Sequence, residues 1–431
     1  MAELIQPVRG MNDILSAAAP LWERLETAAA RIFRAYGYTQ VRLPVLERTE
    51  LFSRSIGELT DIVEKEMYTF EDRNGDSLTL RPEATASVVR ACLSNGLLHN
   101  QQQKLWTAGP MFRREKPQKG RYRQFHQLSV EALGYAEPET DAELIMMSAR
   151  LWQALGIAHV SLELNSLGTP ESRSAYRELL TRYLRDNEAA LDADSRRRLE
   201  RNPMRILDSK NPDMQPLLDA APQLGDHLDT ESLQHFDRVR TLLDDARIEY
   251  TINPRLVRGL DYYTRTVFEW VTDRLGSQSA VCSGGRYDGL VAQLGGRDTP
   301  AVGWALGIER VVELLALDAG EETPSSADLF IACAGDAARR FGFACAETLR
   351  GELPQLRVAF GLAAAGLKAQ LRRADRCGAR FALIIGDDEL AAAEVSVKPL
   401  LSDAPQRRMP LPELIAELRE SGAAAGRAPA A

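Results

Sequence analysis

Between Gly57 and Leu128 the chain carries several short apolar runs separated by turn signals, and this pattern constrains the fold more than any other feature. The runs read MYTF, SLTL, KLWTAGPMF and RQFHQLSV. Asn74-Gly75, between the first two runs, is a strong hairpin signal because both residue types tolerate a positive φ. Short strands joined by tight turns pair antiparallel. The sequence therefore predicts an antiparallel β-sheet in this part of the chain.

A long amphipathic helix and a proline-bearing strand are predicted ahead of this sheet. From Pro20 to Tyr36 apolar side chains recur at helical spacing, and Gly37 supplies a stop. The next segment, VRLPVL at residues 41–46, alternates as a strand does, and Pro44 restricts such a strand to an edge or an interface. A helix followed by an edge strand of this kind is suited to pairing with a second subunit.

Residues 170–247 differ from the chain before them. They are highly charged and interrupted by prolines, and their patterns are otherwise helical, so we expect a helical insertion. Strand patterns return at residues 250–253 and 264–271. AVGWALGIERVVELL, residues 301–315, then predicts a strand followed by a helix.

A small, polar segment, DAGEETPSSA at residues 318–327, indicates a boundary between two domains. Beyond it, strand and helix patterns alternate as in a small α/β domain. The chain is thereby divided into a first domain (1–320), a linker (321–327), an α/β domain (328–421) and a low-complexity tail (422–431) that we expect to be disordered.

Composition places the chain among ordinary globular proteins. Its 431 residues exceed the length at which one hydrophobic core usually stops growing. It is 45% hydrophobic and 26% charged, close to the globular average. No signal peptide or membrane-length apolar run is visible. The cysteines form no CxxC pair or histidine cluster, which argues against zinc and disulfides. We therefore expect a cytoplasmic protein without a membrane segment.

The net charge of −8 gives no general sign of nucleic-acid binding, but one local segment is strongly basic. This segment is FRREKPQKGRYRQFHQ, residues 112–127. Arginine forks suit phosphate oxygens, and Phe125 offers a ring on which a base could stack. Charge runs usually form a solvated surface, and that alternative stays open. The flanking strand patterns make a loop aimed at phosphates competitive.

A second cluster is TLRPEATA at residues 79–86, where a helix is expected to begin near Ala84. Glu83 could cap that helix, or it could receive a substrate ammonium group. Thr85 has the same two interpretations, as a helix-start hydroxyl or as a ligand contact. The residues alone leave these alternatives even.

The third cluster combines LVRGLDYYTRTVFEW, residues 256–270, with SGGRYDGL, residues 283–290. Arg258 has apolar surroundings and requires either an anionic partner, for which Asp261 is the structural candidate, or a ligand phosphate. Tyr262, Tyr263 and Tyr287 could select a polar ring, with core packing as the alternative.

The fourth cluster is the Glu309-Arg310 pair at the start of a predicted helix, which taken alone indicates a charged helix surface. His126 has no nucleophile to pair with and receives no catalytic role. The chain contains neither GxxxxGK[ST] nor a strand-linked GxGxxG. If ATP binds, it binds by other means.

Taken in order, these clusters resemble the three signature motifs of class II aminoacyl-tRNA synthetases, and the third resembles the segments specific to the histidyl-tRNA synthetase family. Pro44 resembles the motif 1 proline at the dimer interface, residues 112–127 resemble motif 2, and GWALGIERVVELL resembles motif 3. The similarity covers nearly the whole chain. One departure is Ala84, which stands where many relatives have glycine.

The resemblance implies an α+β fold. Its catalytic domain would be an antiparallel β-sheet flanked by helices, with a helical insertion and a C-terminal α/β anticodon-binding domain. The implied activity is that of a histidine–tRNA ligase, which forms histidyl-adenylate from L-histidine and ATP and then loads tRNA(His). Mg²⁺ would accompany ATP, and the enzyme would be a cytoplasmic homodimer.

The resemblance also implies roles for individual residues. Arg113 and Arg258 would be catalytic, facing each other across the α-phosphate, with Arg258 in a place that a metal ion fills in other class II enzymes. The residues implied to bind histidine are Glu83, Thr85, Arg113, Gln127, Glu131, Arg258, Tyr262, Tyr263 and Tyr287. Those implied to bind ATP are Arg113, Glu115, Arg121, Phe125 and Arg310. Those implied to meet the tRNA acceptor stem are Lys116, Gln118, Lys119 and Arg123. A basic helix face in the C-terminal domain would meet the anticodon with Lys368, Arg372, Arg373 and Arg376.

Two alternatives compete with this interpretation. One is the histidine-sensing regulatory subunit of ATP phosphoribosyltransferase, which shares the catalytic fold but generally lacks the C-terminal domain and parts of the histidine and ATP signatures. This chain keeps Arg113, Arg258 and Arg310 together with an α/β C-terminal segment, and this combination favours the ligase. The other alternative, a class II synthetase for a different amino acid, requires LVRGLDYY to be coincidental.

Overall fold

The computed structural model describes residues 4–15, 18–56, 60, 62–115, 120–209, 211–260, 262–276, 279–319, 326–361 and 365–420. Two compact units make up the chain, Met1–Gly320 and Glu321–Ala431. The α-helices of the first unit are α1 (Ala19–Ala35), α2 (Thr49–Ile56), α3 (Thr85–Ser94), α4 (Pro138–Leu155), α5 (Pro170–Asp186), α6 (Ala193–Leu199), α7 (Gln215–Asp219), α8 (Thr230–Asp245), α9 (Leu290–Gln293) and α10 (Ile308–Ala319). Its strands are β1 (Thr39–Gln40), β2 (Leu46–Arg48), β3 (Tyr68–Glu71), β4 (Ser77–Leu80), β5 (Gln103–Phe112), β6 (Gln124–Leu133), β7 (Ser161–Ser166), β8 (Thr251–Ile252), β9 (Thr264–Val271), β10 (Ala280–Arg286) and β11 (Ala301–Gly307).

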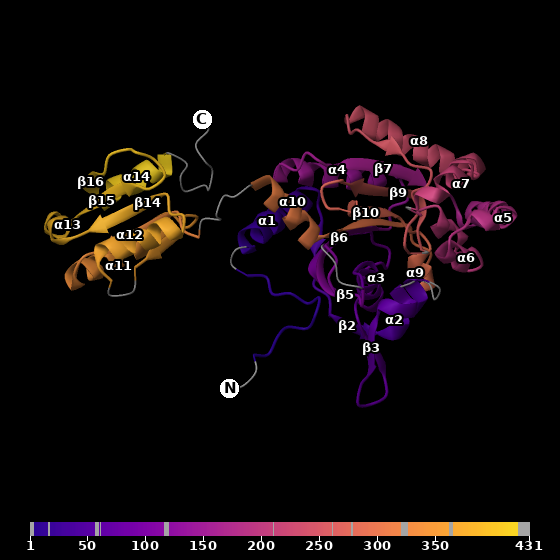
Figure 1. The fold of residues 1–431 in the computed structure, drawn as a ribbon, viewed down its shortest axis with the longest axis horizontal. Helices are drawn as coiled ribbons and strands as arrows, with labels where there is room; N and C mark the ends of the chain where they lie inside the picture. Colours follow the sequence, from indigo (N-terminus) through magenta and orange to yellow (C-terminus); the bar gives the residue numbers. More distant parts are fainter. Residues whose placement is uncertain are drawn as a thin grey trace. The chain divides into compact units, whose positions relative to one another are not determined.

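A large sheet forms the centre of the first unit (Figure 1). Its strand order over the described residues is β1-β5-β6-β11-β10-β9-β7-β8. Neighbouring strands run antiparallel except at the two ends, where β1 pairs with β5 and β7 with β8 in parallel. A smaller antiparallel sheet has the order β2-β4-β3. The predicted antiparallel sheet and the α+β class are confirmed.

The two faces of the large sheet differ in character because side chains alternate along each strand. Leu128, Val130 and Ala132 of β6 belong to a hydrophobic core that also contains side chains of α1, α4, α8 and α10. Gln127 precedes Leu128, and Glu131 lies between Val130 and Ala132. Because side chains alternate, these two polar residues lie on the opposite face of the sheet. The sheet thus has one face covered by helices and one face that carries polar side chains.

The expected strand at residues 41–46 is wrong, whereas the helix before it is confirmed as α1. β1 ends at Gln40 and β2 begins at Leu46. Within this interval the chain leaves the large sheet and joins the small one, and Pro44 has no N–H for a ladder. The carbonyls of Leu43 and Pro44 accept hydrogen bonds from Arg81 Nη1 at 3.3 and 3.4 Å instead.

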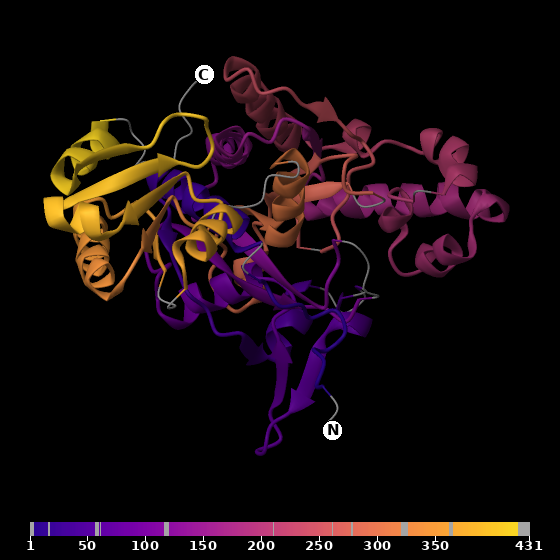
Figure 2. The same ribbon diagram turned by 60° about the vertical axis from the view of Figure 1, so that its left-hand side comes forward.

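The hairpin predicted at Asn74-Gly75 is confirmed between β3 and β4, and it projects from the first unit in both ribbon views (Figure 2). Gly75 has a φ of +85°, a conformation that favours glycine. Asp72 Oδ1 accepts the backbone N–H groups of Asn74 at 2.8 Å and Asp76 at 3.0 Å. The turn is therefore stabilised by its own side chains.

The predicted insertion is helical, but its last helix is part of the main core. Phe236, Val239 and Leu243 of α8 pack in the same cluster as α1 and α4. The earlier helices α5, α6 and α7 lie on the side of the unit farthest from α1 (Figure 1). Their buried side chains share a second core with Tyr262, Tyr263 and Tyr287. The inserted helices thus share a hydrophobic core with these three tyrosines.

The second unit is a mixed sheet with helices, as an alternating pattern predicts. Its elements are β12 (Leu329–Cys333), α11 (Asp336–Glu352), β13 (Val358–Phe360), α12 (Leu367–Arg376), β14 (Phe381–Ile385), α13 (Asp387–Ala392), β15 (Glu394–Pro399), β16 (Arg407–Pro410) and α14 (Leu411–Glu420). The order is β13-β12-β14-β15-β16, in which the first three strands are parallel and the last two pairings are antiparallel. The predicted basic helix face, consisting of Lys368, Arg372, Arg373 and Arg376, is exposed on α12.

Several predictions concern parts of the chain outside the described residues. Most of the predicted linker and all of the predicted tail are of this kind. Among the helices that are described, none is long and apolar enough to cross a membrane. The five cysteines are free thiols. No group of three or more His, Cys, Asp or Glu side chains within the described ranges is arranged to hold a metal ion.

Candidate functional site

A pocket on the polar face of the large sheet brings the separate sequence clusters together. Its walls come from the start of α3, the region around β6, β10, β11, the start of α10, and residues Arg258, Leu260, Tyr262 and Tyr263. The predicted site residues that line it are Glu83, Thr85, Arg113, Glu115, Arg121, Phe125, Gln127, Arg258, Tyr262, Tyr263 and Arg310. Residues more than 200 positions apart in the sequence therefore share one cavity.

The pocket floor follows from the strand register. Gln127 pairs with Gly307, Ser283 pairs with Ala305, and Ser283 also pairs with Glu269. Directly opposite residues on antiparallel strands point to the same side of a sheet. Polar groups on three strands are thereby aligned beneath the pocket.

Glu83 caps α3 in this structure. Its carboxylate accepts the backbone N–H groups of Thr85 at 2.6 Å and Ala86 at 2.9 Å. Burial raises the pKa of Glu83, although these hydrogen bonds and the charge of Arg113 act in the opposite direction. The capping interpretation is thus correct, and Glu83 also lines the pocket.

Glu131 lies completely buried behind the pocket, where two hydroxyl groups hold its carboxyl. Thr85 Oγ1 donates to Oε1 at 2.7 Å, and the hydroxyl of Tyr287 donates to Oε2. Burial raises the pKa of Glu131 to about 8, against the lowering effect of these hydrogen bonds. Gly303 leaves room for the carboxyl, because a Cβ there would lie 1.8 Å from Oε2. A carboxyl in this environment is poised to gain or lose a proton near neutral pH.

Three buried tyrosines form a contiguous cluster beside Glu131. The ring centroids of Tyr262 and Tyr263 are 4.7 Å apart, and those of Tyr262 and Tyr287 are 5.5 Å apart. Tyr262 and Tyr263 line the pocket, whereas Tyr287 and its partner Glu131 lie behind the lining, with the Tyr287 ring against both other tyrosines. All three also belong to a hydrophobic core, so packing and pocket lining coexist here.

Arg258 forms its ion pair with Glu269. The distance from Nη1 to Oε1 is 2.6 Å, and Ser283 Oγ donates to the same oxygen at 2.9 Å. Burial alone would lower the pKa of Arg258, but the charge of Glu269 raises it overall. The guanidinium also lies over the ring of Tyr263, 5.6 Å from the centroid. Asp261, the partner considered from the sequence, lies outside the described residues.

Arg113 lies between α3 and β6. Its Nε donates to the carbonyl of Pro82 at 2.8 Å, and its guanidinium lies over the ring of Phe125 at 5.3 Å. A backbone hydrogen bond and a ring contact thus hold the arginine at the pocket wall.

Two further arginines, Arg121 and Arg310, add positive charge near Arg113. Arg121 pairs with Glu115 at 2.8 Å. Burial and the charge of Arg121 both lower the pKa of Arg310. Such repulsion between neighbouring cations is relieved by an anionic ligand.

Of the four residues assigned to the tRNA acceptor stem, Lys116, Gln118 and Lys119 lie outside the described residues. Arg123 is described and does not line the pocket. Its Nε donates to the carbonyl of Glu115 at 3.3 Å and its Nη1 to that of Arg9 at 3.4 Å. The N-terminal segment therefore contacts the chain at Arg123.

Some pocket residues were missed or undervalued by sequence reasoning. Glu269 forms the ion pair with Arg258, Ser283 donates a hydrogen bond to Glu269, and Gly303 leaves space for Glu131. Glu269 could have been noticed as the single charge within the apolar strand TVFEWV. The helix-surface interpretation of Glu309 and Arg310 is wrong, because both line the pocket.

Glu309 connects two of the sequence clusters. Its carboxylate accepts the backbone N–H of His126 at 2.9 Å, and Nδ1 of the same histidine lies 2.9 Å from Oε1. The His126 ring also meets Trp22 edge-on at 5.0 Å. His126 therefore joins β6 to α10 and α1.

Two family models match the chain. The model described as histidyl-tRNA synthetase matches residues 10–311, and the one described as anticodon binding domain matches residues 329–421. Together they extend over both compact units.

Known proteins similar to this chain carry consistent names. A curated histidine–tRNA ligase of Halorhodospira halophila (strain DSM 244 / SL1) is 59% identical over 415 residues, which are 96% of this chain and 98% of that protein. The crystal structure of an apo S. aureus histidyl-tRNA synthetase has a TM-score of 0.76 at 35% identity, covering 96% of this chain and 99% of the other. A histidyl-tRNA synthetase from Nostoc sp. PCC 7120 has a TM-score of 0.73 at 20% identity, covering 97% and 100% of the two chains; this likeness concerns the fold.

Proposed function

The chain belongs to the histidyl-tRNA synthetase family, and from this premise we propose that the pocket binds L-histidine and ATP side by side for adenylate formation. The chain's activity is that of a histidine–tRNA ligase, which activates L-histidine with ATP and transfers it to tRNA(His). The regulatory-subunit alternative is disfavoured, because the relative with 59% identity is a ligase and the chain carries an anticodon-binding domain.

The observation that carries the proposal is the division of the pocket into two ends. The histidine end consists of Glu83, Thr85, Tyr262 and Tyr263, which line the pocket, together with the buried pair Glu131 and Tyr287, which reaches it through the hydrogen bond from Thr85 to Glu131. The phosphate end consists of Arg113, Glu115, Arg121, Arg258 and Arg310. The first end suits an ammonium group and a polar ring, and the second suits carboxylate and phosphate oxygens.

Two buried atoms of pocket-lining residues support this placement. Gln127 Oε1 and Arg258 Nε have no hydrogen-bond partner among the described residues. A buried polar atom without a partner costs about 1–3 kcal/mol. An amino acid supplies both missing groups, since its ammonium donates to the amide oxygen and its carboxylate accepts from the guanidinium.

The histidine ammonium would therefore meet Glu83, Thr85 and Gln127. The imidazole would be read by Glu131 and Tyr263, with Tyr262 and Tyr287 completing the wall. A site that forms hydrogen bonds to both ring nitrogens rejects analogues that lack them, because its own buried groups would then remain unpaired.

At the phosphate end, Arg113 and Arg258 would hold the α-phosphate and the substrate carboxylate from two sides. Arg121 and Arg310 would hold the terminal phosphates. Glu115 would approach the adenine edge, and Phe125 would stack on the base. The carboxylate oxygen attacks the α-phosphorus and pyrophosphate leaves. Fixed positive charge placed where negative charge develops accounts for most of the rate in such transfers.

Mg²⁺ is proposed to enter with ATP. The carboxylate of Glu309 lines the pocket, and it fits an ion that is usually bound by one or two carboxylates together with substrate phosphates. When bound, the ion would neutralise charge on the phosphate oxygens.

The tRNA and a second copy of the chain are the proposed macromolecular partners, and the cytoplasm is the proposed location. The loop of residues 116–119 together with Arg123 would meet the acceptor stem. The exposed basic face of α12 supports an anticodon contact. Pro44 is exposed and Leu46 is 38% exposed, which supports a homodimer contact at this segment.

ATP–pyrophosphate exchange, measured with each amino acid in turn, tests the proposal. We expect exchange with histidine alone. Arg258→Ala should reduce that exchange by about 10²–10³-fold, the loss typical of removing one group that stabilises developing negative charge, while the protein stays folded. Exchange with no amino acid, with a different one, or undiminished in Arg258→Ala would contradict it.

A further inference from the structure

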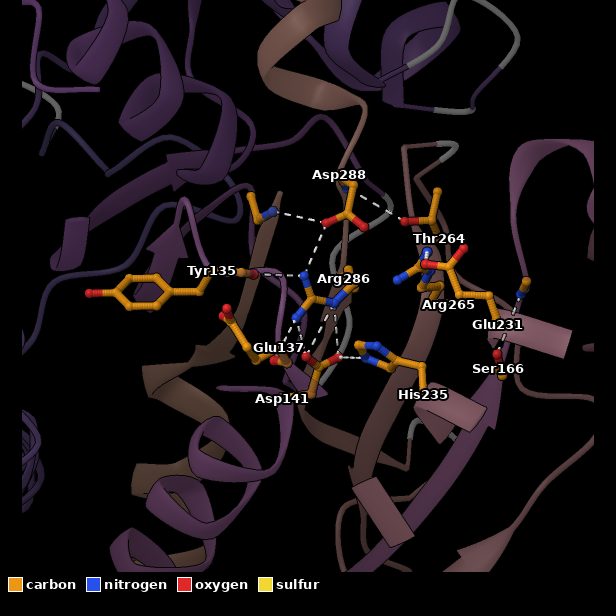
Figure 3. A network of polar contacts seen from close by, with 12 residues as sticks. Tyr135, Glu137, Asp141, Ser166, Glu231, His235, Thr264, Arg265, Arg286 and Asp288 are labelled. Atoms are coloured by element: carbon orange, nitrogen blue, oxygen red, sulfur yellow. Dashed lines mark hydrogen bonds and ion pairs between the residues drawn. The ribbon is translucent and has the colours of Figure 1, made fainter. Parts of the chain in front are cut away.

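A buried polar network centres on Arg286 (Figure 3). The side chain of Arg286 is fully buried. Its Nε donates to Asp141 Oδ2 at 3.1 Å, and Nη2 also contacts that carboxylate. Nη1 donates to the carbonyl of Tyr135 at 2.9 Å and to Asp288 Oδ1 at 3.1 Å. Nη2 also donates to the carbonyl of Glu137 at 3.3 Å.

These partners belong to three separate pieces of the fold. Asp141 lies in the first turn of α4, while Tyr135 and Glu137 lie in the connection from β6 to α4. Arg286 is the last residue of β10, and Asp288 follows it by two positions. One guanidinium fork therefore fixes the end of β6, the start of α4 and the end of β10 relative to one another. A lysine ammonium is a compact point charge, so it cannot donate hydrogen bonds to this many acceptors arranged around one plane.

The network reaches the proposed histidine site through Tyr287. Tyr287 follows Arg286 directly, and its backbone N–H donates to the carbonyl of Ala301 at 2.7 Å. The N–H of Ala301 in turn donates to Asp288 Oδ1 at 3.0 Å. The Tyr287 hydroxyl donates to Glu131, which lies on β6 four residues before Tyr135. Arg286 thus binds the chain beside both members of the Tyr287–Glu131 pair.

The carboxylate at the centre of the network is stabilised in its charged form. Burial alone would raise the pKa of Asp141, but the charge of Arg286 and hydrogen bonds from His235 and Arg286 bring it below the ordinary value. Asp141 also benefits from its place near the N-terminus of α4. His235 of α8 adds a further contact, with Nε2 3.3 Å from Asp141 Oδ1. The inserted segment is thereby tied to the same carboxylate.

We propose that Arg286 is a positioning residue for histidine recognition, which holds Tyr287 and Glu131 at the spacing at which they read the imidazole. This inference rests on the proposed role of Glu131 in binding histidine. Recognition through a buried carboxyl depends on geometry to within about 0.5 Å. Loss of the Arg286 contacts should therefore weaken the binding of histidine more than the binding of ATP. A merely structural ion pair would weaken both substrates alike.

Arg286→Lys tests the proposal, because it keeps the charge and removes the fork. In pyrophosphate exchange we expect KM for histidine to rise by about tenfold or more, within the range that small misplacements of a binding group produce, with KM for ATP unchanged. Arg265→Lys is the matched control. The Arg265–Glu231 pair, 2.6 Å long, also joins the sheet to α8 and has no contact with Tyr287 or Glu131; this variant should leave both KM values unchanged.

Coupling between positions separates positioning from general stability. Arg286→Lys combined with Tyr287→Phe should raise KM for histidine by less than the product of the two single effects, because both act through one contact. Multiplicative effects, or an equal rise of KM for ATP and histidine in Arg286→Lys, would overturn the proposal. If Arg286→Lys does not fold, Asp288→Ala decides by the same KM comparison, since the Asp288 side chain is 29% exposed and accepts from both Arg286 and Ala301.

Glu131→Gln in the same assay separates the recognition role of Glu131 from the positioning role of Arg286. Unchanged KM for histidine in Glu131→Gln would refute the proposed recognition role itself. A raised KM in Glu131→Gln, with no effect in Arg286→Lys or Asp288→Ala, would refute only the positioning role of Arg286.

Discussion

The two ends of the pocket are built in opposite ways. At the histidine end, Glu131 and Glu83 are buried and hold internal hydrogen bonds from neighbouring hydroxyl and backbone groups. At the phosphate end, Arg121 is exposed and Arg113 and Arg310 are only partly buried. The first end is held by internal hydrogen bonds, whereas the second carries an excess of more exposed positive charge beside the ion pairs Arg121–Glu115 and Arg258–Glu269.

Under the proposed function, this difference would separate recognition of histidine from the chemistry at the phosphates. A prearranged, buried network selects by geometry, because a wrong ligand leaves its groups unpaired. Partly exposed fixed charges favour any reaction that builds negative charge at that place. Substitutions at the two ends should therefore fail in different ways, the first in histidine affinity and the second in rate.

The largest effect is expected for Gly303→Ala at the histidine end. The new Cβ would lie 1.8 Å from Glu131 Oε2 and 2.5 Å from the carbonyl of Val130, so the carboxyl must move. We expect kcat/KM for histidine in pyrophosphate exchange to fall by about 10³-fold, since binding geometry and stability are both disturbed. Gly225→Ala is the control, because nothing lies within 4 Å of a Cβ there. A Gly303→Ala enzyme with normal histidine kinetics would contradict the proposed role of Glu131 in histidine recognition.

A smaller effect of a different kind is expected for Glu269→Gln at the phosphate end. The variant retains the shape of the side chain but removes the charge that pairs with Arg258 at 2.6 Å. We expect kcat for exchange to fall by about 10–10²-fold as Arg258 loses its fixed orientation, with a lesser change in KM for histidine. A result in which KM for histidine rises and kcat is preserved would place Arg258 in recognition instead.

Protonation of Glu131 gives a third prediction, for stability. Its pKa of about 8 in the folded chain exceeds the ordinary carboxyl value, so the folded state holds the proton more tightly. The resulting stabilisation is complete at acid pH below the unfolded-state pKa and is lost as pH rises through about 8. Compared with Glu131→Gln, the unmodified chain should therefore lose on the order of a few kcal/mol of unfolding free energy between about pH 5 and pH 8. Denaturant titrations check this, and parallel pH profiles for the two proteins would argue against it.

The smallest effect on the pocket is expected from the second unit. Replacing Arg372 and Arg376 on the exposed face of α12 by glutamine should leave histidine-dependent exchange unchanged, since neither residue lines the pocket. The same variant should raise KM for tRNA in aminoacylation by about several-fold, because cations on such faces supply phosphate contacts. A change in histidine-dependent exchange in this variant would contradict the expectation that α12 has no effect on the pocket.

The two ends also differ in how far the sequence predicts them. Local sequence patterns predict the elements of the phosphate end. These patterns are a basic segment between two strand patterns, and a strand pattern followed directly by a helix pattern. Alternation along the strand at residues 264–271 predicts β9 at its observed bounds. Local periodicity suffices where hydrogen bonding and side-chain direction are set by neighbours along the chain.

The histidine end depends on contacts between distant strands, which no local pattern contains. Glu131 enters the prediction only through the family resemblance, because a carboxyl within the apolar run SVEAL has no visible partner. Its partners Thr85 and Tyr287 are 46 and 156 residues away. The failed strand at residues 41–46 has a similar cause, since the change from one sheet to the other is determined by long-range pairing.

Histidine binding in the absence of ATP tests the division of the pocket most directly. Calorimetric titration of L-histidine should show that Glu131→Gln weakens binding by about tenfold or more, the cost of one buried hydrogen-bonding group. Arg310→Ala, at the end proposed for the terminal phosphates, should bind histidine with the affinity of the unmodified chain. Equal losses in both variants, or a loss only in Arg310→Ala, would contradict the separation of recognition from chemistry.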